Sequence, residues 1–255
     1  MDPRPVDWPG SALLPVAPLR PVLERLASLA RTHEDDVELV PGLAEAEAAG
    51  DPPPALVQIV EELGGISVRG GSGLELLTAS RSDEGPYTLL GAPTTFYPLH
   101  EGADVAVVLT LDEDGRPGAV HGIGEDLALR LAAPDLGTYL ERYADALEAT
   151  LTALDASPAE GSARDEAARD LMDEHLFDAL LGTGAAAELP LREMVAPARA
   201  EGVELPVGAL ASGDLRDAAV GTGLDVIDAP IDGDPLEHHL AWCAEGLVVC
   251  WVPRP

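Results

Sequence analysis

The sequence offers few groups of side chains whose types and spacing could bind a metal ion or carry out catalysis. His33 is followed by the acidic run Glu34–Asp36, and His238 is followed by His239. A zinc site takes three or four ligands at one point, and His33 has no second histidine at ligand spacing. Adjacent residues of a helix point about 100° apart, so His238 and His239 do not readily face one metal. We therefore expect a solvated helix end at the first group, a helix face at the second, and no metal site.

The other short motifs fit turns and core positions better than active sites. DEDG at residues 112–115 lacks the alternating oxygen ligands and the final Glu of a calcium loop, so it predicts a hairpin turn. The sequence has no Gly-x-Ser-x-Gly motif, no Walker loop and no dinucleotide-binding glycine pattern. Cys250 lies in the apolar run GLVVCWV and Cys243 has no basic neighbour, so we expect neither to be a reactive thiolate. We expect no catalytic residue and no cofactor.

The charge balance is the most unusual property of the composition. The chain has 46 acidic residues against 15 basic ones, all of them Arg, and a formal net charge of -31. This charge repels the phosphates of nucleic acids and the surfaces of anionic membranes, so neither is an expected partner. Two interpretations remain open: a soluble surface that repels copies of itself, or an acidic surface that complements a basic protein.

Composition also indicates a globular, cytoplasmic protein. Apolar residues make up 46% of the chain and aromatic residues only 4%, so the core must consist mainly of Leu, Val and Ala. No apolar run approaches the ~18 residues that span a bilayer, and MDPRPVDWPG lacks the pattern of a signal peptide. Two cysteines do not make a disulfide framework, which favours a reducing cytoplasm. The Ala-rich, Lys-free composition is typical of a GC-rich bacterium.

The stretch IVEELGGISV, residues 59–68, predicts an abrupt change from helix to strand. A first helix is expected over residues 21–35, and the apolar spacing of residues 52–63 predicts a second. A glycine directly after a helix can adopt a left-handed conformation that satisfies the last carbonyl groups, so we expect Gly64 to end the second helix. Short strands are then predicted at residues 66–69 and 74–80.

The middle of the chain predicts a hairpin-connected sheet and a long closing helix. VAVVLTL at residues 105–111, AVHGIG and LALRL are strand candidates around the DEDG turn. Over residues 134–156 one apolar stripe predicts an amphipathic helix, formed by Leu136, Leu140, Tyr143, Leu147, Leu151 and Leu154. DASPAEGSARDE at residues 155–166 predicts a linker, with Ser162 as the N-cap of another helix.

Three stretches, in this order, resemble the SUKH superfamily, which contains bacterial immunity proteins and fungal cell-wall assembly regulators. They are PPPALVQIVEELGGISV, VAVVLTLDEDGRPGAVHGI and LALRLAAPDLGTYLERYADALE, and together they cover about residues 20–150. In that family a helix ends at a paired-glycine turn, strands with an Asp/Gly turn follow, and a helix closes the domain.

The expected fold is therefore α+β, with a central, mostly antiparallel sheet flanked by helices. We predict a Pro-rich arm over residues 1–19, a SUKH-like domain over 20–154, a linker over 155–166, and a small α/β or α+β unit over 167–255.

The resemblance implies a non-catalytic, intracellular protein-binding module, an immunity protein that occludes a basic, nuclease-type toxin. Acidic residues in loops around the predicted strands are then the candidate partner-binding residues: Asp83, Glu84, Glu101, Asp104, Asp112, Glu113, Asp114, Glu125 and Asp126. The alternative is a regulatory or scaffolding protein that docks a housekeeping partner and uses its C-terminal unit for dimerisation or a second contact. The sequence leaves the oligomeric state open.

Overall fold

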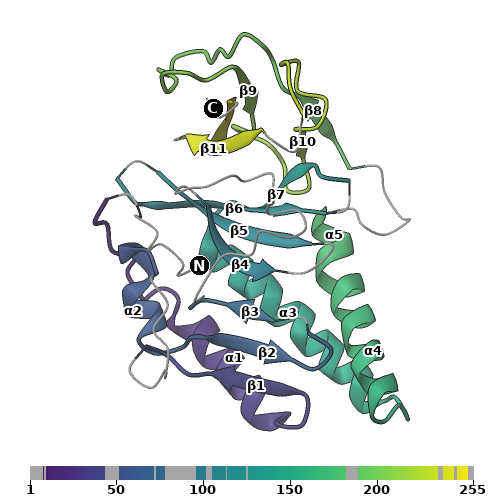
Figure 1. Cartoon of the computed structure of the whole chain (residues 1–255). Coiled ribbons are helices and arrows are strands. Elements are labelled where there is room, and N and C mark those ends of the chain that lie inside the picture. Colours follow the sequence, from purple (N-terminus) through teal and green to yellow (C-terminus); the bar gives the residue numbers. More distant parts are fainter. Residues whose placement is uncertain are drawn as a thin grey trace, which may run out of the picture.

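The computed structural model describes residues 8, 10–43, 52–71, 73–77, 96–101, 105–112, 114–124, 126–181, 189–234, 238–243 and 246–251. These residues form helices and three β-sheets, so the fold is α+β, as the sequence predicts. Figure 1 shows strands β1 to β7 following one another along the molecule, with the C-terminal strands at one end of this series. Among the described helices, none is long and apolar enough to cross a membrane.

The first part of the chain builds a small sheet under one helix. Helix α1 (Arg20–Thr32) buries one face and leads into β1 (Val37–Val40). A short helix, α2 (Val57–Val60), precedes β2 (Gly65–Val68) and β3 (Leu74–Glu75). The three strands pair antiparallel in the order β1-β2-β3.

The two adjacent glycines are required by a close approach of backbones. The second helix is shorter than predicted. It consists of a 3₁₀ turn (Pro54–Leu56) followed by α2, which ends at Val60. Gly64 does not have a positive φ, so the expectation of a left-handed helix cap is wrong. A Cβ atom at Gly64 would lie 2.2 Å from the carbonyl oxygen of Pro41, and one at Gly65 would lie 2.2 Å from that of Leu74. Glycine is needed here so that the chain can pass between its neighbours.

A six-stranded sheet forms the centre of the molecule. Its strands are β4 (Phe96–Glu101), β5 (Ala106–Leu111), β6 (Pro117–Ile123), β7 (Leu129–Ala133), β10 (Gly223–Asp225) and β8 (Leu191–Glu193), in the order β4-β5-β6-β7-β10-β8. All neighbours pair antiparallel except β10 and β8, which are parallel. The hydroxyl of Tyr97 in β4 donates to the carbonyl of Leu76 at 3.0 Å, which ties this sheet to the segment after β3.

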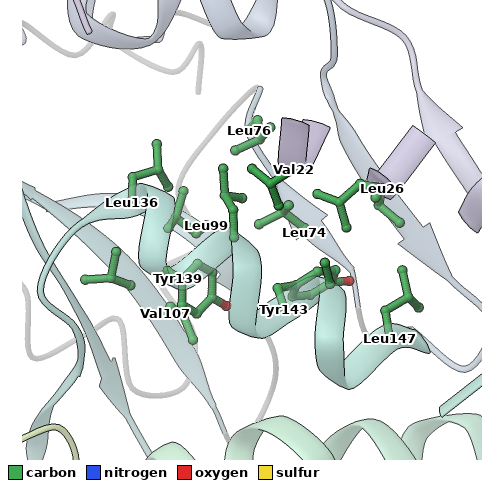
Figure 2. Close-up of a cluster of buried hydrophobic side chains, with 14 of the residues drawn as sticks. Val22, Leu26, Leu74, Leu76, Leu99, Val107, Leu136, Tyr139, Tyr143 and Leu147 are labelled. Atoms are coloured by element: carbon green, nitrogen blue, oxygen red, sulfur yellow. The ribbon is translucent and has the colours of Figure 1, made fainter. Parts of the chain in front are cut away.

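Helix α3 (Leu136–Asp155) covers one face of the central sheet. Asp135 caps its first turn, because the Asp135 side chain accepts a hydrogen bond of 2.7 Å from the Thr138 amide. The predicted apolar stripe is confirmed, since each of its six residues is buried. Figure 2 shows Tyr143 and Leu147 of this stripe, and Tyr139 of the same helix, packed with residues of α1, β3, β4 and β5.

The helices after the predicted linker join the same core. Helix α4 (Ser162–Met172) continues through a π-helical segment (Asp173–Phe177) into α5 (Asp178–Leu181). Met172, Leu176 and Phe177 belong to the hydrophobic cluster that also contains the α3 stripe. The N-cap position of α4 is Gly161, so Ser162 is the first helical residue and the predicted Ser162 cap is wrong.

The C-terminal strands cover the second face of the central sheet. β9 (Ala211–Asp214), β11 (His239–Cys243) and β12 (Leu247–Trp251) form an antiparallel sheet in the order β11-β12-β9. Alternate residues of the central strands pack against it in one hydrophobic cluster, which includes Phe96, Val108, Ile123, Leu240, Trp242 and Val248. In the described segments after residue 189 turns connect the strands, and no α-helix is among them.

Candidate functional site

The acidic residues that are predicted to bind a partner and that the structure describes lie at two opposite ends of the central sheet. Glu101 pairs with Ala106, and Ala106 pairs with Ile123, so these positions form one row, which we call the far end. The β5–β6 turn that carries Asp112 and Asp114 lies at the other end of β5, which we call the hairpin end. Six residues of strand separate the two ends by roughly 17 Å along β5. Five of the predicted residues lie outside the described residues: Asp83, Glu84, Asp104, Glu113 and Glu125.

At the hairpin end, Asp112 holds the turn together. Its Oδ1 accepts hydrogen bonds from the amides of Asp114 at 2.9 Å and Arg116 at 2.7 Å. Gly115 has a φ of 76°, a left-handed value that glycine adopts without strain. The predicted hairpin turn is thus confirmed. Asp114 keeps 60% of its side chain exposed while it accepts a hydrogen bond of 2.6 Å from Arg116.

At the far end, Asp126 pairs with a buried arginine. Arg130 exposes only 7% of its side chain, and its Nη2 donates to Oδ2 of Asp126. Oδ1 of Asp126 accepts a hydrogen bond of 3.1 Å from the Ala128 amide, which orders the turn between β6 and β7. Asp112 and Asp126 therefore each have a structural role in a turn, and their partner-binding role stays a prediction.

The most strongly held carboxylate in the described chain is Asp36, which sequence reasoning placed in a solvated helix end. Asp36 is 4% exposed, and Arg164 binds it in a bidentate manner, with Nε–Oδ1 at 2.7 Å and Nη2–Oδ2 at 2.5 Å. Arg69 adds a longer contact of 3.4 Å to Oδ1. Arg164 also donates to the carbonyl of Leu154 at 2.8 Å, so it fixes the end of α3 to the turn after α1.

Asp36 is charged because of these arginines. The hydrogen bonds from Arg164 lower the pKa of Asp36 from its usual value, although burial acts in the opposite direction. A carboxylate that stays ionised and has both oxygens occupied is poorly suited to transfer protons. Asp36 therefore acts as an anchor for the two arginines.

An open cleft of about 620 Å³ surrounds this anchor, and we call it the acidic cleft. Exposed carboxylates line its rim, namely Glu34, Asp35, Asp155 and Glu160. The hydroxyl groups of the cleft are engaged locally: Thr32 donates to the Ser28 carbonyl at 2.9 Å, and Ser157 accepts from the Ala159 amide at 3.2 Å. The arrangement suits the binding of a cationic group and contains no activated nucleophile among its described residues.

The other groups considered for chemistry occupy structural positions. Cys250 is fully buried in β12, and burial raises the pKa of its thiol to about 11, so it is not a thiolate at neutral pH. His238 directly precedes β11 and is buried, and His239 is the first residue of β11 and is half-buried, so the expectation of a helix face is wrong. Within the described segments, no three His, Cys, Asp or Glu residues are placed to hold a metal ion.

Sequence reasoning missed the acidic cleft because its two halves are far apart in the chain. Asp36 and Arg164 are separated by 128 positions, and no local spacing links them. No strand is predicted from the sequence at residues 37–40 either, so the burial of Asp36 before β1 had no local signal.

No family model, curated protein or solved structure matches the chain. The SUKH resemblance consequently stays a prediction.

Proposed function

We propose that this chain is a non-catalytic protein-binding module whose acidic surface holds a basic protein partner. The proposal rests on one observation, which is that many of the arginines form ion pairs within the chain itself. Seven arginines of the described chain form ion pairs within the molecule: Arg20, Arg25, Arg69, Arg116, Arg130, Arg164 and Arg216. Their charge is used within the chain, and because acidic residues outnumber basic ones by 46 to 15, a large negative excess remains.

Such a surface favours fast association with a cationic protein. Complementary charge raises the association rate and makes it fall with ionic strength, because salt screens charges beyond about 8 Å under physiological conditions. The acidic cleft offers a concave part of this surface, where the rim carboxylates Asp35 and Glu160 can receive lysine or arginine side chains. A nuclease that holds phosphate has the matching basic surface.

The SUKH resemblance makes this proposal more specific. On that basis the partner is a basic, nuclease-type toxin, and the chain acts in the cytoplasm as an immunity protein that occludes it. An occluding inhibitor needs a stable, charged surface and no reacting group, which agrees with the structural roles of Asp36 and Cys250.

The experiment starts with the full chain immobilised and exposed to lysate of its native cell at low and then moderate salt. A stoichiometric basic protein released by salt is then purified and its affinity for the chain is measured directly. Its nuclease activity, measured with and without the chain, tests inhibition. A housekeeping partner without toxic activity would favour the scaffolding alternative.

Paired charge reversals locate the binding surface. We compare three double variants: Asp35→Lys with Glu160→Lys at the acidic cleft, Glu101→Lys with Asp104→Lys among the predicted partner-binding residues, and Glu201→Lys with Glu204→Lys as a control of equal charge. Asp112 is left unchanged because it holds the hairpin turn. The proposal predicts that at least one of the first two pairs weakens binding much more than the control. Equal, small effects from all three pairs would contradict a defined acidic binding surface.

A further inference from the structure

An apolar groove of about 420 Å³ lies at the hairpin end of the central sheet, and we call it the arm groove. It is formed where the N-terminal arm and α1 meet the start of β6 and the first turn of α3. Leu19, Val22 and Leu136 form its buried floor. Its volume lies within the roughly 300–1,000 Å³ of typical ligand sites.

The groove is formed in advance by rigid parts of the chain. Pro18 and Pro117 are among the residues that line it, and proline has a fixed φ angle. The amide of Leu14 in the arm donates to the carbonyl of Ala55 at 3.0 Å, which holds the arm in place. Gly10 lies so close to the hairpin that a Cβ atom there would be 1.8 Å from the carbonyl oxygen of Asp114. Little ordering of the arm is then required when an apolar group enters.

The borders of the groove combine apolar and acidic surface. Leu13 is 57% exposed beside Leu14, which lines the groove. Glu141 also lines it and keeps 56% of its side chain exposed, with only a 3.5 Å contact to Arg25. The exposed carboxylate of Asp114 lies in the turn that leads directly into Pro117.

An anion is a poor occupant even though the groove reaches the N-terminus of α3. Both oxygens of Asp135 already accept hydrogen bonds from Thr138, from its amide at 2.7 Å and from its hydroxyl at 2.9 Å. This carboxylate satisfies the first turn of the helix, and the acidic border repels further negative charge.

We propose that the arm groove receives an apolar side chain of the basic partner, flanked in the partner by arginine or lysine residues. The apolar side chain is buried between Leu19, Val22 and Leu136, and the flanking cations contact Glu141 and Asp114. This inference rests on the proposed function, because it assigns an anchor point to the same basic partner. It explains why exposed Leu13 and the apolar groove lie next to two carboxylates that stay largely exposed.

The first test uses peptide probes on the full chain. One probe has a leucine flanked on each side by two arginines; the matched probe has alanine in place of leucine. Burial of the leucine should make its probe bind about tenfold more tightly. In methyl-labelled protein, the leucine probe should shift the methyl signals of Leu19, Val22 and Leu136. Equal affinities of the two probes, or shifts confined to other methyl groups, would overturn the groove assignment.

The second test uses matched variants of the groove. Pro18→Trp fills the groove and should weaken the leucine probe about tenfold, whereas Ala17→Trp adds the same side chain to an adjacent residue outside the lining and should not. Glu141→Arg should weaken both probes about threefold, more than Glu148→Arg does on the same helix. Glu148 also pairs with Arg25, at 2.5 Å, which makes it a close control.

The outcomes separate this inference from the proposed function. A variant with altered circular dichroism is set aside, and the assignment is then decided by the remaining groove variant and by the methyl signals. If neither probe binds the unmodified chain in a salt-dependent manner, the acidic-surface proposal fails as well. If both probes bind equally and Pro18→Trp has no effect, the acidic surface stands and the groove assignment is wrong.

Discussion

Each face of the central sheet buries a histidine, but the two histidines differ in their hydrogen bonding. His100 lies on the helical face, where its Nδ1 is 2.8 Å from the carbonyl oxygen of Gly73 and its ring lies 4.9 Å from that of Phe177. His121 lies on the face covered by the C-terminal sheet. It is fully buried, and neither ring nitrogen has a hydrogen-bond partner among the described residues.

The difference extends to the packing of the two faces. The helical face has the larger hydrophobic cluster, continuous from α1 through α3 to α5, and the Asp36–Arg164 pair ties its helices together. The C-terminal face has the smaller cluster. Here Trp242 of the C-terminal sheet packs directly over Gly118 of the central sheet, a contact for which a side chain at residue 118 would leave no room. We infer that the helical face determines global stability and that the C-terminal sheet is released more easily.

The largest expected effect comes from truncation on the helical face. Leu147→Ala should lower the free energy of unfolding by about 4 kcal/mol, because Leu147 is fully buried between helices and a cavity would remain. Urea unfolding, followed by circular dichroism and by fluorescence in variants that keep only Trp8 or only Trp242 of the three tryptophans, measures the change. Both tryptophans should report the same lower midpoint. Leu240→Ala on the C-terminal face should shift the Trp242 signal first, and coincident signals in that variant would contradict the comparison.

Removal of one partner of the buried ion pair comes next. Arg164→Ala leaves the Asp36 carboxylate buried with only the longer Arg69 contact, which should cost about 3 kcal/mol. Thermal unfolding measures the loss. The matched control is Arg20→Ala, which breaks an exposed pair with Glu62 and should cost less than about 1 kcal/mol. Similar losses in the two variants would show that the Asp36 anchor is unimportant.

The C-terminal face should be sensitive to acid through His121. Burial lowers the pKa of His121 from 6.5 to about 4, so between these values the unfolded chain binds a proton that the folded chain does not. Stability therefore falls as the pH decreases through this window, by up to about 3 kcal/mol from this residue. The free energy of unfolding of the unmodified chain and of His121→Leu, measured from pH 7 to pH 4, should differ in slope. Parallel curves would show that His121 is not protonated on unfolding.

The smallest expected effect comes from the glycine under Trp242. A Cβ atom at Gly118 would lie 2.6 Å from the Trp242 ring, so Gly118→Val should force the C-terminal sheet away at a cost of about 2 kcal/mol. Hydrogen exchange should increase in β9, β11 and β12 and remain unchanged in α3. Adding Trp242→Leu should recover part of the loss if the clash is the cause. Faster exchange in α3 would mean that the two faces are not independent.

Sequence patterns were sufficient where the physical cause is local. The stripe of α3 repeats with the period of a helix, and Asp112 and Gly115 favour a turn by their own backbone and side-chain preferences, so both features were predicted correctly. The left-handed cap expected at Gly64 was wrong, because the glycine is needed there for the close approach of Pro41, a contact that is not local. The α+β class follows from the same local periods.

The tertiary structure decided what depends on distant contacts. It pairs Asp36 with Arg164, places the described members of the predicted acidic set at two opposite ends of one sheet, and assigns His239 to a strand. It also covers the second face of the central sheet with the C-terminal strands, as Trp242 over Gly118 shows. Local preference sets the type of each element, whereas the burial of apolar surface selects which elements meet, and that choice depends on all of them at once.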